Sequence, residues 1–195
     1  MRLIIARHGQ TEENKKKIFQ GQLPGKLSEL GIEQAKKLAL RLKKENIDII
    51  YSSDLARASD TAKEISKYHK AQIYFVKELR EKDFGEYTGK SWSTVNNFDE
   101  LVNNTDSSKG VETRKSVELR VKALLDSVYQ KHKNSNVLFV SHDGTNKILM
   151  SLILEEAKMP YENLENQRNA ALNIFEIFED KNHKVHLFNC RKHLD

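Results

Sequence analysis

Residues 3–9 read Leu-Ile-Ile-Ala-Arg-His-Gly, an apolar run that ends directly on two polar side chains. Consecutive apolar residues are typical of a strand that is buried on both faces, as in a parallel sheet covered by helices. In open α/β sheets, ligands bind beyond the carboxyl ends of such strands. We therefore expect Arg7 and His8 at a ligand-binding edge of the sheet.

Three further apolar runs repeat this pattern. Ile47 to Tyr51 and Val137 to Val140 also end on polar residues, and Ile73 to Val76 is interpreted as another buried strand. A segment from Ala171 to Phe178 alternates imperfectly and predicts a strand near a sheet edge.

Between these runs, apolar residues recur at helical spacing, which predicts helices that pack on the sheet. The sequence therefore predicts an α/β fold with a mainly parallel central sheet flanked by helices on both faces. The two stripes that carry this prediction are Ile32, Ala35, Leu38 and Leu42, and then Val117, Val121, Leu124 and Val128.

The length and composition favour one folded domain. The chain has 195 residues, of which 38% are hydrophobic and 31% are charged, with only two prolines. This composition excludes a collagenous or disordered chain, and we expect a single domain over residues 1–195. Residues 86–110 are rich in Asn, Ser, Thr and Asp, and we expect them to form a small irregular lid-like insertion.

The single cysteine, Cys190, cannot form an internal disulfide, which favours a reducing, cytoplasmic compartment. The run Leu3 to Ala6 is too short for a signal peptide or a membrane span.

The formal charge is +5, but Lys and Glu are interleaved, so we expect no nucleic acid and no membrane partner. A homodimer is compatible with the sequence. Lys15 to Lys17 form the densest basic cluster, which we interpret as a solvated loop or as a contact for the far end of an anionic substrate.

The residue types at the strand ends fit phosphate chemistry. A neutral imidazole at His8 is a nucleophile toward phosphorus, and the guanidinium of Arg7 can hold phosphate oxygens with two hydrogen bonds. Gly9 allows backbone N–H groups to approach an anion. The fourth run ends on a second histidine, His142, and Arg57 lies in the first turn of a predicted helix, where an anion is favoured.

Taken together and in order, these segments resemble the histidine phosphatase superfamily, also called phosphoglycerate mutase-like. The match spans nearly the whole chain. Its segments are Arg7-His8-Gly9, Asn14, Gln20-Gly21, Leu27-Ser28-x-x-Gly31, Ser52-Ser53-Asp54-Leu55-x-Arg57-Ala58-Ser59-x-Thr61-Ala62, Leu79-Arg80-Glu81, Phe84-Gly85-x-Tyr87-x-Gly89 and Ser141-His142-x-Gly144.

The resemblance implies a phosphohistidine intermediate on His8. It implies that Arg7, Arg57 and His142 bind the transferred phosphoryl group and that Glu81 is the proton donor and acceptor. Cationic side chains would then neutralise the phosphoryl oxygens, so the resemblance implies neither a metal nor a cofactor. Further phosphate-binding contacts are expected from Asn14, Gln20, Gly21 and Asp143.

The sequence departs from the family's commonest pattern in four places, and two of these departures, Gln10 and Asp143, lie next to predicted site residues. Gln10 stands where Glu is usual, which removes a negative charge near the nucleophile. Asp143 replaces a usual glycine after the second histidine and places a carboxylate near the phosphate, which alters the expected preference for substrate charge.

The function expected from this resemblance is a metal-independent, histidine acid-type phosphatase acting on a small phosphorylated metabolite. The alternatives are a cofactor-dependent phosphoglycerate mutase and a non-catalytic sensor of a phosphate ligand. The span from Gly85 to Glu112 is short, which would leave the pocket open to water and favours hydrolysis over mutase activity. A protein phosphatase remains an open alternative, because Tyr87 and Trp92 could line either a closed pocket or an open groove.

Overall fold

The computed structural model describes residues 1–95, 101, 107, 109–155 and 161–195. Its centre is one six-stranded sheet with the strand order β3-β2-β4-β1-β5-β6. The first four strands in this order are parallel, β5 pairs antiparallel with β1, and β6 pairs antiparallel with β5, so the predicted α/β fold with a mainly parallel sheet is confirmed. The strands are β1 (Arg2–Arg7), β2 (Ile49–Ser53), β3 (Gln72–Val76), β4 (Asn136–Ser141), β5 (Leu172–Glu176) and β6 (Lys184–Cys190).

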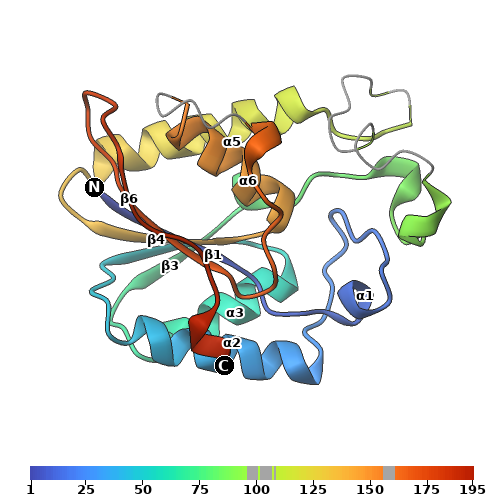
Figure 1. Ribbon diagram of the computed structural model, residues 1–195, viewed down its shortest axis with the longest axis horizontal. Helices are drawn as coiled ribbons and strands as arrows, with labels where there is room; N and C mark the ends of the chain where they lie inside the picture. The colour runs from blue at the N-terminus through green and yellow to red at the C-terminus, as the bar shows by residue number, and fades with distance from the viewer. Residues whose placement is uncertain (96–100, 102–106, 108, 156–160) are drawn as a thin grey trace.

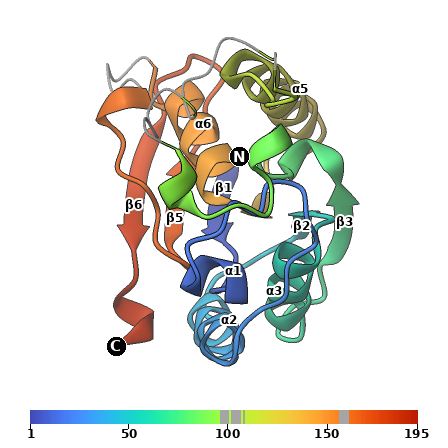
Figure 2. The ribbon, with the colours of Figure 1, turned by 90° about the vertical axis from the view of Figure 1, so that its right-hand side faces the viewer.

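Helices cover both faces of the sheet, with α2 and α3 on one side and α5 and α6 on the other (Figures 1 and 2). Side chains of β1 alternate between the two layers: Ile4 and Ala6 pack with α2 and α3, while Leu3 and Ile5 pack with α5 and α6. The apolar run therefore fills two cores at once. The helices are α1 (Glu12–Lys15), α2 (Glu29–Leu42), α3 (Ala56–Ser66), α5 (Arg114–Lys131) and α6 (Asp143–Ile153), and the short 3₁₀ turns are η1 (Lys77–Leu79), η2 (Gly85–Tyr87), η3 (Trp92–Thr94), η4 (Tyr161–Asn163) and η5 (Lys192–Leu194).

The start of α2 lies directly against the loop that follows β1. Ser28 caps the helix by accepting a hydrogen bond from the backbone N–H of Gly31. At Gly31 the helix meets the backbone of Gln10, because a Cβ there would lie only 1.9 Å from the Gln10 carbonyl oxygen. The close approach holds the loop after His8 in place.

Two of the predicted strands have a different environment from the one expected. The prediction that Ile73 to Val76 is buried is wrong, because β3 is the edge strand and both Tyr74 and Phe75 are 47% exposed. The segment from Ala171 to Phe178 contains β5, which lies next to the edge and is covered there by β6. Strand β6 was not predicted, since its sequence mixes polar and apolar residues without regular alternation and none of them is fully buried.

Both predicted helical stripes form helices that pack on the sheet. In α2, the residues Ala35, Leu38 and Leu42 are buried, but Ile32 is 45% exposed, so its assignment to the core is wrong. In α5, three of the four stripe residues are buried and Leu124 is partly buried against the same core. Position 32 lies in the first turn of α2, ahead of the stripe residues that pack on the sheet.

The predicted lid-like insertion at residues 86–110 is described only in part, because 96–100, 102–106 and 108 lie outside the described residues. The described part contains the short turns η2 and η3 and is hydrogen-bonded to the loop after α1. The backbone N–H of Gly89 donates to the Phe19 carbonyl at 2.8 Å, and that of Trp92 donates to the Lys17 carbonyl at 2.8 Å. The rings of Phe19 and Trp92 lie 6.3 Å apart, so the two segments form one apolar wall.

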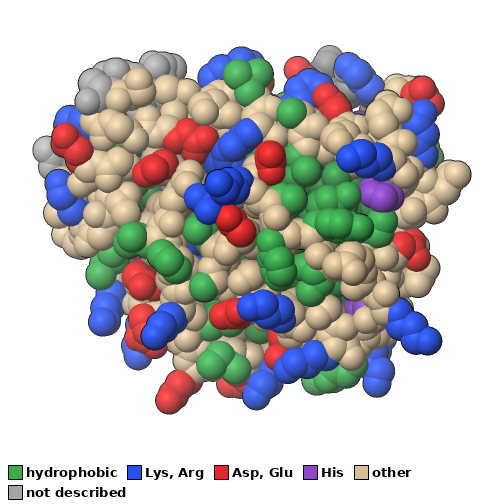
Figure 3. Space-filling model, turned by 180° about the vertical axis from the view of Figure 1, so that it is seen from behind, with side chains coloured by type: hydrophobic (Ala, Val, Ile, Leu, Met, Phe, Trp, Pro, Cys, Tyr) green, Lys and Arg blue, Asp and Glu red, His purple; other side chains and the backbone are tan. Residues whose placement is uncertain are grey.

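Charged side chains of both signs are interspersed over the described part of the face shown in Figure 3. Among the described residues, no helix is both long and apolar enough to cross a membrane.

Because Gly31 lies so close to Gln10, we predict that adding a single methyl group at position 31 strongly lowers the stability of the fold. In Gly31→Ala, the Cβ would overlap the Gln10 carbonyl, so the free energy of unfolding is expected to fall by about 1–3 kcal/mol or more. Urea denaturation measures this change. The control, Lys36→Ala at an exposed position of the same helix, is expected to change the free energy by less than about 0.5 kcal/mol. Equal stability of the two variants would contradict the close approach.

Candidate active site

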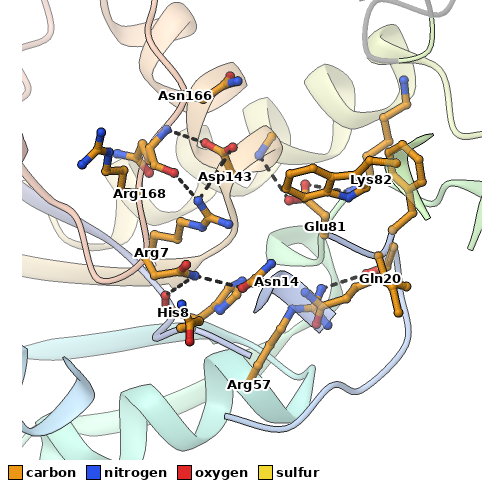
Figure 4. Close-up of a pocket in the computed structure, with 18 of the residues that line it drawn as sticks. Arg7, His8, Asn14, Gln20, Arg57, Glu81, Lys82, Asp143, Asn166 and Arg168 are labelled. Carbon is orange, nitrogen blue, oxygen red and sulfur yellow. Dashed lines mark hydrogen bonds and ion pairs between the residues drawn. The ribbon is translucent and has the colours of Figure 1, made fainter. Parts of the chain in front are cut away.

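The carboxyl ends of β1, β2 and β4 lie side by side in the sheet and open into one pocket of about 740 Å³. The sequence predicted this juxtaposition, and the pocket is lined by most of the predicted residues (Figure 4). A pocket of this volume is larger than a phosphate group requires, so it also has room for an organic group. The predicted residues on its wall are Arg7, His8, Asn14, Gln20, Gly21, Arg57, Glu81 and Asp143.

His8 lies at the base of the pocket and is 2% exposed. Its Nδ1 is 2.7 Å from the Gly9 carbonyl oxygen. Because a carbonyl can only accept, Nδ1 carries the proton, and Nε2 has a lone pair in the neutral ring. Burial, Arg57 and Arg7 hold the pKa of His8 well below its ordinary value. The ring is thus kept in its nucleophilic form.

His142 is fully buried and does not line the pocket. Its ring centroid is 5.1 Å from that of His8, and both ring nitrogens are engaged. Nδ1 accepts from Nε of Arg57 at 3.1 Å, and Nε2 lies 2.9 Å from Oγ of Ser53. Its pKa is also well below the ordinary value, mainly because of burial and then Arg57. A direct phosphate contact requires one of these bonds to break, so that contact stays a prediction.

Arg57 is 1% exposed and connects three segments of the site. Besides Nε on His142, its Nη2 donates to the Gly21 carbonyl at 2.8 Å, and its Nη1 donates to the carbonyls of Leu23 and Pro24. A guanidinium has five N–H donors, so these four bonds leave one N–H for a bound anion. Burial lowers the pKa of Arg57 to about 10, which leaves the group charged at neutral pH.

Arg7 lies on the opposite side of His8 and is held by the backbone of the loop before β5. Its Nη1 donates to the Gln167 carbonyl and lies 3.8 Å from Oδ2 of Asp143. Oδ1 of Asp143 accepts from the backbone N–H of Gln167 at 2.6 Å. Arg7 and Asp143 therefore share one anchor, and both face the pocket (Figure 4).

The Glu81 carboxylate is bound to the first turn of α6. It accepts from the backbone N–H groups of Gly144 at 3.2 Å and Thr145 at 3.1 Å, from the Thr145 hydroxyl at 3.2 Å, and from the N–H of Lys82 at 3.0 Å. The glycine is required for this approach, because a Cβ at Gly144 would lie 2.8 Å from Oε1 of Glu81. The predicted motif after His142 thus has a structural cause.

Two further motif residues fix the position of these groups. Arg80 forms a bidentate ion pair with Asp54, with both N–O distances 2.6 Å, and so joins the β2–α3 turn to the segment that carries Glu81. Thr61 of α3 accepts from the N–H of Gly9 at 3.2 Å and donates to the Arg57 carbonyl at 2.8 Å. The nucleophile loop and Arg57 are therefore held by the same hydroxyl.

Asn14, Gln20 and Gly21 line the pocket from the loop after β1, as predicted. Asn14 is the third residue of α1 and completes a capping box with Thr11, and its Oδ1 accepts from Asn169 at 3.0 Å. Oε1 of Gln20 is buried without a hydrogen bond in the described part of the chain. Gly21 has a positive φ of 50°, which lets its carbonyl face Arg57.

Sequence reasoning missed several residues of the pocket, among them Lys82, Tyr161, Gln167 and Asn169. Lys82 is 5% exposed and donates to the Leu101 carbonyl at 2.8 Å, and burial lowers its pKa to about 8. Burial raises the pKa of Tyr161, whose ring lies 4.0 Å below the Arg114 guanidinium. Gln167 and Asn169 come from the loop before β5. Only Lys82 had a signal, its position directly after Glu81, since no motif marks the other three.

Among the described residues, no group of three or more His, Cys, Asp or Glu side chains could hold a metal ion. Cys190 is a free, partly buried thiol at the end of β6 and does not line the pocket.

Comparison with known families gives a match to the model described as histidine phosphatase superfamily (branch 1), over residues 3–190. Phosphoserine phosphatase 1 of Hydrogenobacter thermophilus is 36% identical over 149 residues, covering 73% of this chain and 71% of that protein. Phosphoglycerate mutase-like protein 4 of Arabidopsis thaliana is 29% identical over 203 residues, covering 99% and 86%.

Among solved structures, this chain is similar to phosphoserine phosphatase of Entamoeba histolytica in complex with 3-phosphoglyceric acid. The TM-score is 0.83 and the sequence identity is 29%, with 99% of this chain and 98% of that chain covered.

The four bonds of Arg57 predict that charge alone cannot replace it. Lysine is also cationic, but its ammonium cannot reach His142 and three carbonyls together, so Arg57→Lys is expected to lower the free energy of unfolding by about 2–4 kcal/mol. Urea denaturation measures the loss. The same exchange at the partly exposed Arg41, which pairs with Glu45, should cost less than about 1 kcal/mol. Equal losses at the two positions would be incompatible with the role given to Arg57.

The lowered pKa values of His8 and His142 predict sensitivity to acid. In the unfolded chain both imidazoles take up a proton below about pH 6.5, whereas in the fold they stay neutral to lower pH. The free energy of unfolding should therefore fall as the pH drops below about 6.5, by up to about 1.4 kcal/mol per pH unit for each histidine. Urea denaturation between pH 7 and pH 5 measures the slope. His8→Ala should show a shallower slope, and an unchanged slope would contradict this assignment.

Proposed function

The chain belongs to the histidine phosphatase superfamily, and we propose that it is a phosphomonoester hydrolase that carries the phosphoryl group on His8. The observation that carries this proposal is the state of His8: a buried, neutral ring with its proton fixed on Nδ1, at the base of a pocket whose wall includes Arg7 and Arg57. Phosphatase activity in the family supports it.

In the first step, the lone pair on Nε2 of His8 attacks phosphorus, and the bond from phosphorus to the ester oxygen breaks. The leaving oxygen takes a proton from Glu81, so the alcohol is released neutral. The proton on Nδ1 stays in place and keeps its hydrogen bond to the Gly9 carbonyl oxygen, which stabilises the cationic phosphohistidine. The equatorial oxygens are bound by Arg7 and Arg57, which can neutralise their charge without a metal.

In the second step, a water molecule gives a proton to Glu81, and the water oxygen attacks phosphorus. The bond to Nε2 breaks, inorganic phosphate leaves, and His8 regains its lone pair. Glu81 faces the pocket from the segment anchored to Thr145, so the same carboxyl serves both steps. We assign Asn14, Gln20 and Gly21 to the phosphate side of the pocket, because all three lie on the loop that also binds Arg57 or Asn169.

His142 is assigned a supporting role in this mechanism. It holds Nε of Arg57 and packs beside His8, so its removal would misalign both. A contact to the phosphoryl group, expected from the family resemblance, would follow if substrate drew the ring away from Ser53.

The substrate is proposed to be a small phosphorylated metabolite, because Trp92, Phe84 and Tyr161 line the same pocket as the proposed phosphate-binding residues. A mutase is the second candidate, favoured by the similarity to the phosphoglycerate mutase-like protein of Arabidopsis thaliana. The two functions differ in whether inorganic phosphate appears.

The test is release of phosphate from p-nitrophenyl phosphate and a panel of phosphorylated metabolites. We expect turnover that EDTA does not change and that vanadate, a mimic of five-coordinate phosphorus, inhibits. His8→Ala should lower turnover by at least about 10³-fold, since the nucleophile is lost. His186→Ala, on the exposed edge strand β6, is the control. Near-normal activity of His8→Ala, or activity that requires added Mg²⁺, would refute the mechanism, and substrate isomerisation without phosphate release would indicate a mutase.

A further inference from the structure

Asp143 is a charged pocket residue that the phosphate chemistry above does not use. It is the first residue of α6, directly after His142, at a position where the family resemblance leads one to expect glycine. Its carboxylate lines the pocket, and 27% of its side-chain surface remains exposed. A carboxylate here repels a phosphate dianion, so it cannot be a phosphate ligand in its own right.

The two carboxylates of the pocket differ in how many hydrogen bonds they accept from the protein. Glu81 accepts four hydrogen bonds, whereas Asp143 accepts one short bond from the N–H of Gln167. The nearest cation is Arg7, whose Nη1 is 3.8 Å from Oδ2, beyond hydrogen-bond distance. Oδ2 of Asp143 therefore has acceptor capacity that a bound ligand can use.

The electrostatics agree with this geometry. Burial and the nearby charge of Glu81 raise the pKa of Asp143, while Arg7, the Gln167 N–H and Lys147 oppose the rise. The carboxylate is thus short of compensating positive charge. Once Arg7 engages a phosphate, it compensates Asp143 less, and a cation brought by the ligand would restore the balance.

We propose that Asp143 binds an ammonium group of the substrate, and that the preferred substrates are phosphate esters with a cationic amino group close to the ester oxygen. This rests on the proposed function of the same pocket and narrows its substrate class. The carboxylate recognises the part of the substrate that differs between metabolites, while Arg7 and Arg57 recognise the phosphate that all of them share.

Distances set the position of the amino group. A phosphate oxygen bound to Nη1 of Arg7 lies about 3 Å from that nitrogen, which places Oδ2 of Asp143 no more than about 7 Å from the oxygen. An amino group on the second carbon from the ester oxygen is about 4 Å from that oxygen in an extended chain, and a hydrogen bond to a carboxylate adds about 3 Å. An amino group at this carbon therefore reaches Oδ2 while the phosphate stays on Arg7.

Asp143 also has structural contacts, and the experiment has to separate them from recognition. Its Oδ1 anchors the backbone of Gln167, and an acidic residue in the first turn favours the helix dipole. Loss of either would harm all substrates alike. Selectivity between two esters that differ only in the amino group is insensitive to such common losses.

The probes are O-phosphoserine and 3-phosphoglycerate, which differ by an ammonium in place of a hydroxyl. The wild-type chain is expected to prefer O-phosphoserine by at least about tenfold in kcat/KM. Asp143→Asn keeps an oxygen for the Gln167 N–H but removes the charge, and it should lower this preference by about tenfold. Asp60→Asn, the same change at an exposed site on α3, should leave the preference unchanged.

A binding measurement keeps this test independent of turnover. Trp92 is the single tryptophan of the chain and lines the pocket, so its fluorescence reports ligand binding. In the His8→Ala background, O-phosphoserine should bind at least about tenfold more tightly than 3-phosphoglycerate, and adding Asp143→Asn should remove the difference.

Two results would overturn the ammonium site: no preference for O-phosphoserine in the wild-type chain, or an unchanged preference in Asp143→Asn. An unchanged preference with an equal loss for both esters would mean that Asp143 only positions Arg7. If no ester is hydrolysed, the proposed hydrolysis fails, and the ratio of the two binding constants still supports or overturns the ammonium site.

Discussion

The site depends on one buried cation, the guanidinium of Arg57. Taking a guanidinium out of water costs several kcal/mol, and this cost is tolerated only where hydrogen bonds replace the lost water. The replacements come from His142 at the end of β4 and from three carbonyls of the loop between β1 and α2. Arg57 can therefore be buried only if helix, strand end and loop are assembled together.

This constraint also sets the protonation states around it. Arg57 and Arg7 disfavour a second positive charge nearby, so the buried imidazoles of His8 and His142 stay neutral. The same two arginines attract the phosphate dianion. The proposed nucleophile and the proposed anion-binding pocket thus follow from one arrangement of charge, and the hydrogen bond from His8 to Gly9 then decides which ring nitrogen keeps its lone pair.

The sequence predicted the buried strands, which are continuous apolar runs, and the polar site residues, which lie in dense motifs. Strands β1 and β4 are buried on both faces, so their positions and the polar residues after them could be read directly. The burial of β3 could not, because Tyr74 and Phe75 favour a strand whether or not a neighbour covers it. Strand β6 was missed because an exposed edge strand lacks apolar periodicity. Gln167 and Asn169 enter the pocket through tertiary contacts of the loop before β5, which has no local sequence pattern.

The residues of the pocket differ in how many hydrogen bonds the rest of the protein makes to their side chains. Glu81 and Arg57 are each held by four hydrogen bonds to groups of the fold, which fixes their geometry for a phosphoryl group that is the same in every substrate. Asp143 is anchored through one oxygen only, and the other faces the space beyond Arg7. A group with unmet acceptor capacity gains most from a ligand that supplies a donor, and it penalises a ligand that does not. Selectivity in this fold can therefore change by a single residue at the start of α6, without any movement of the groups that carry out the chemistry.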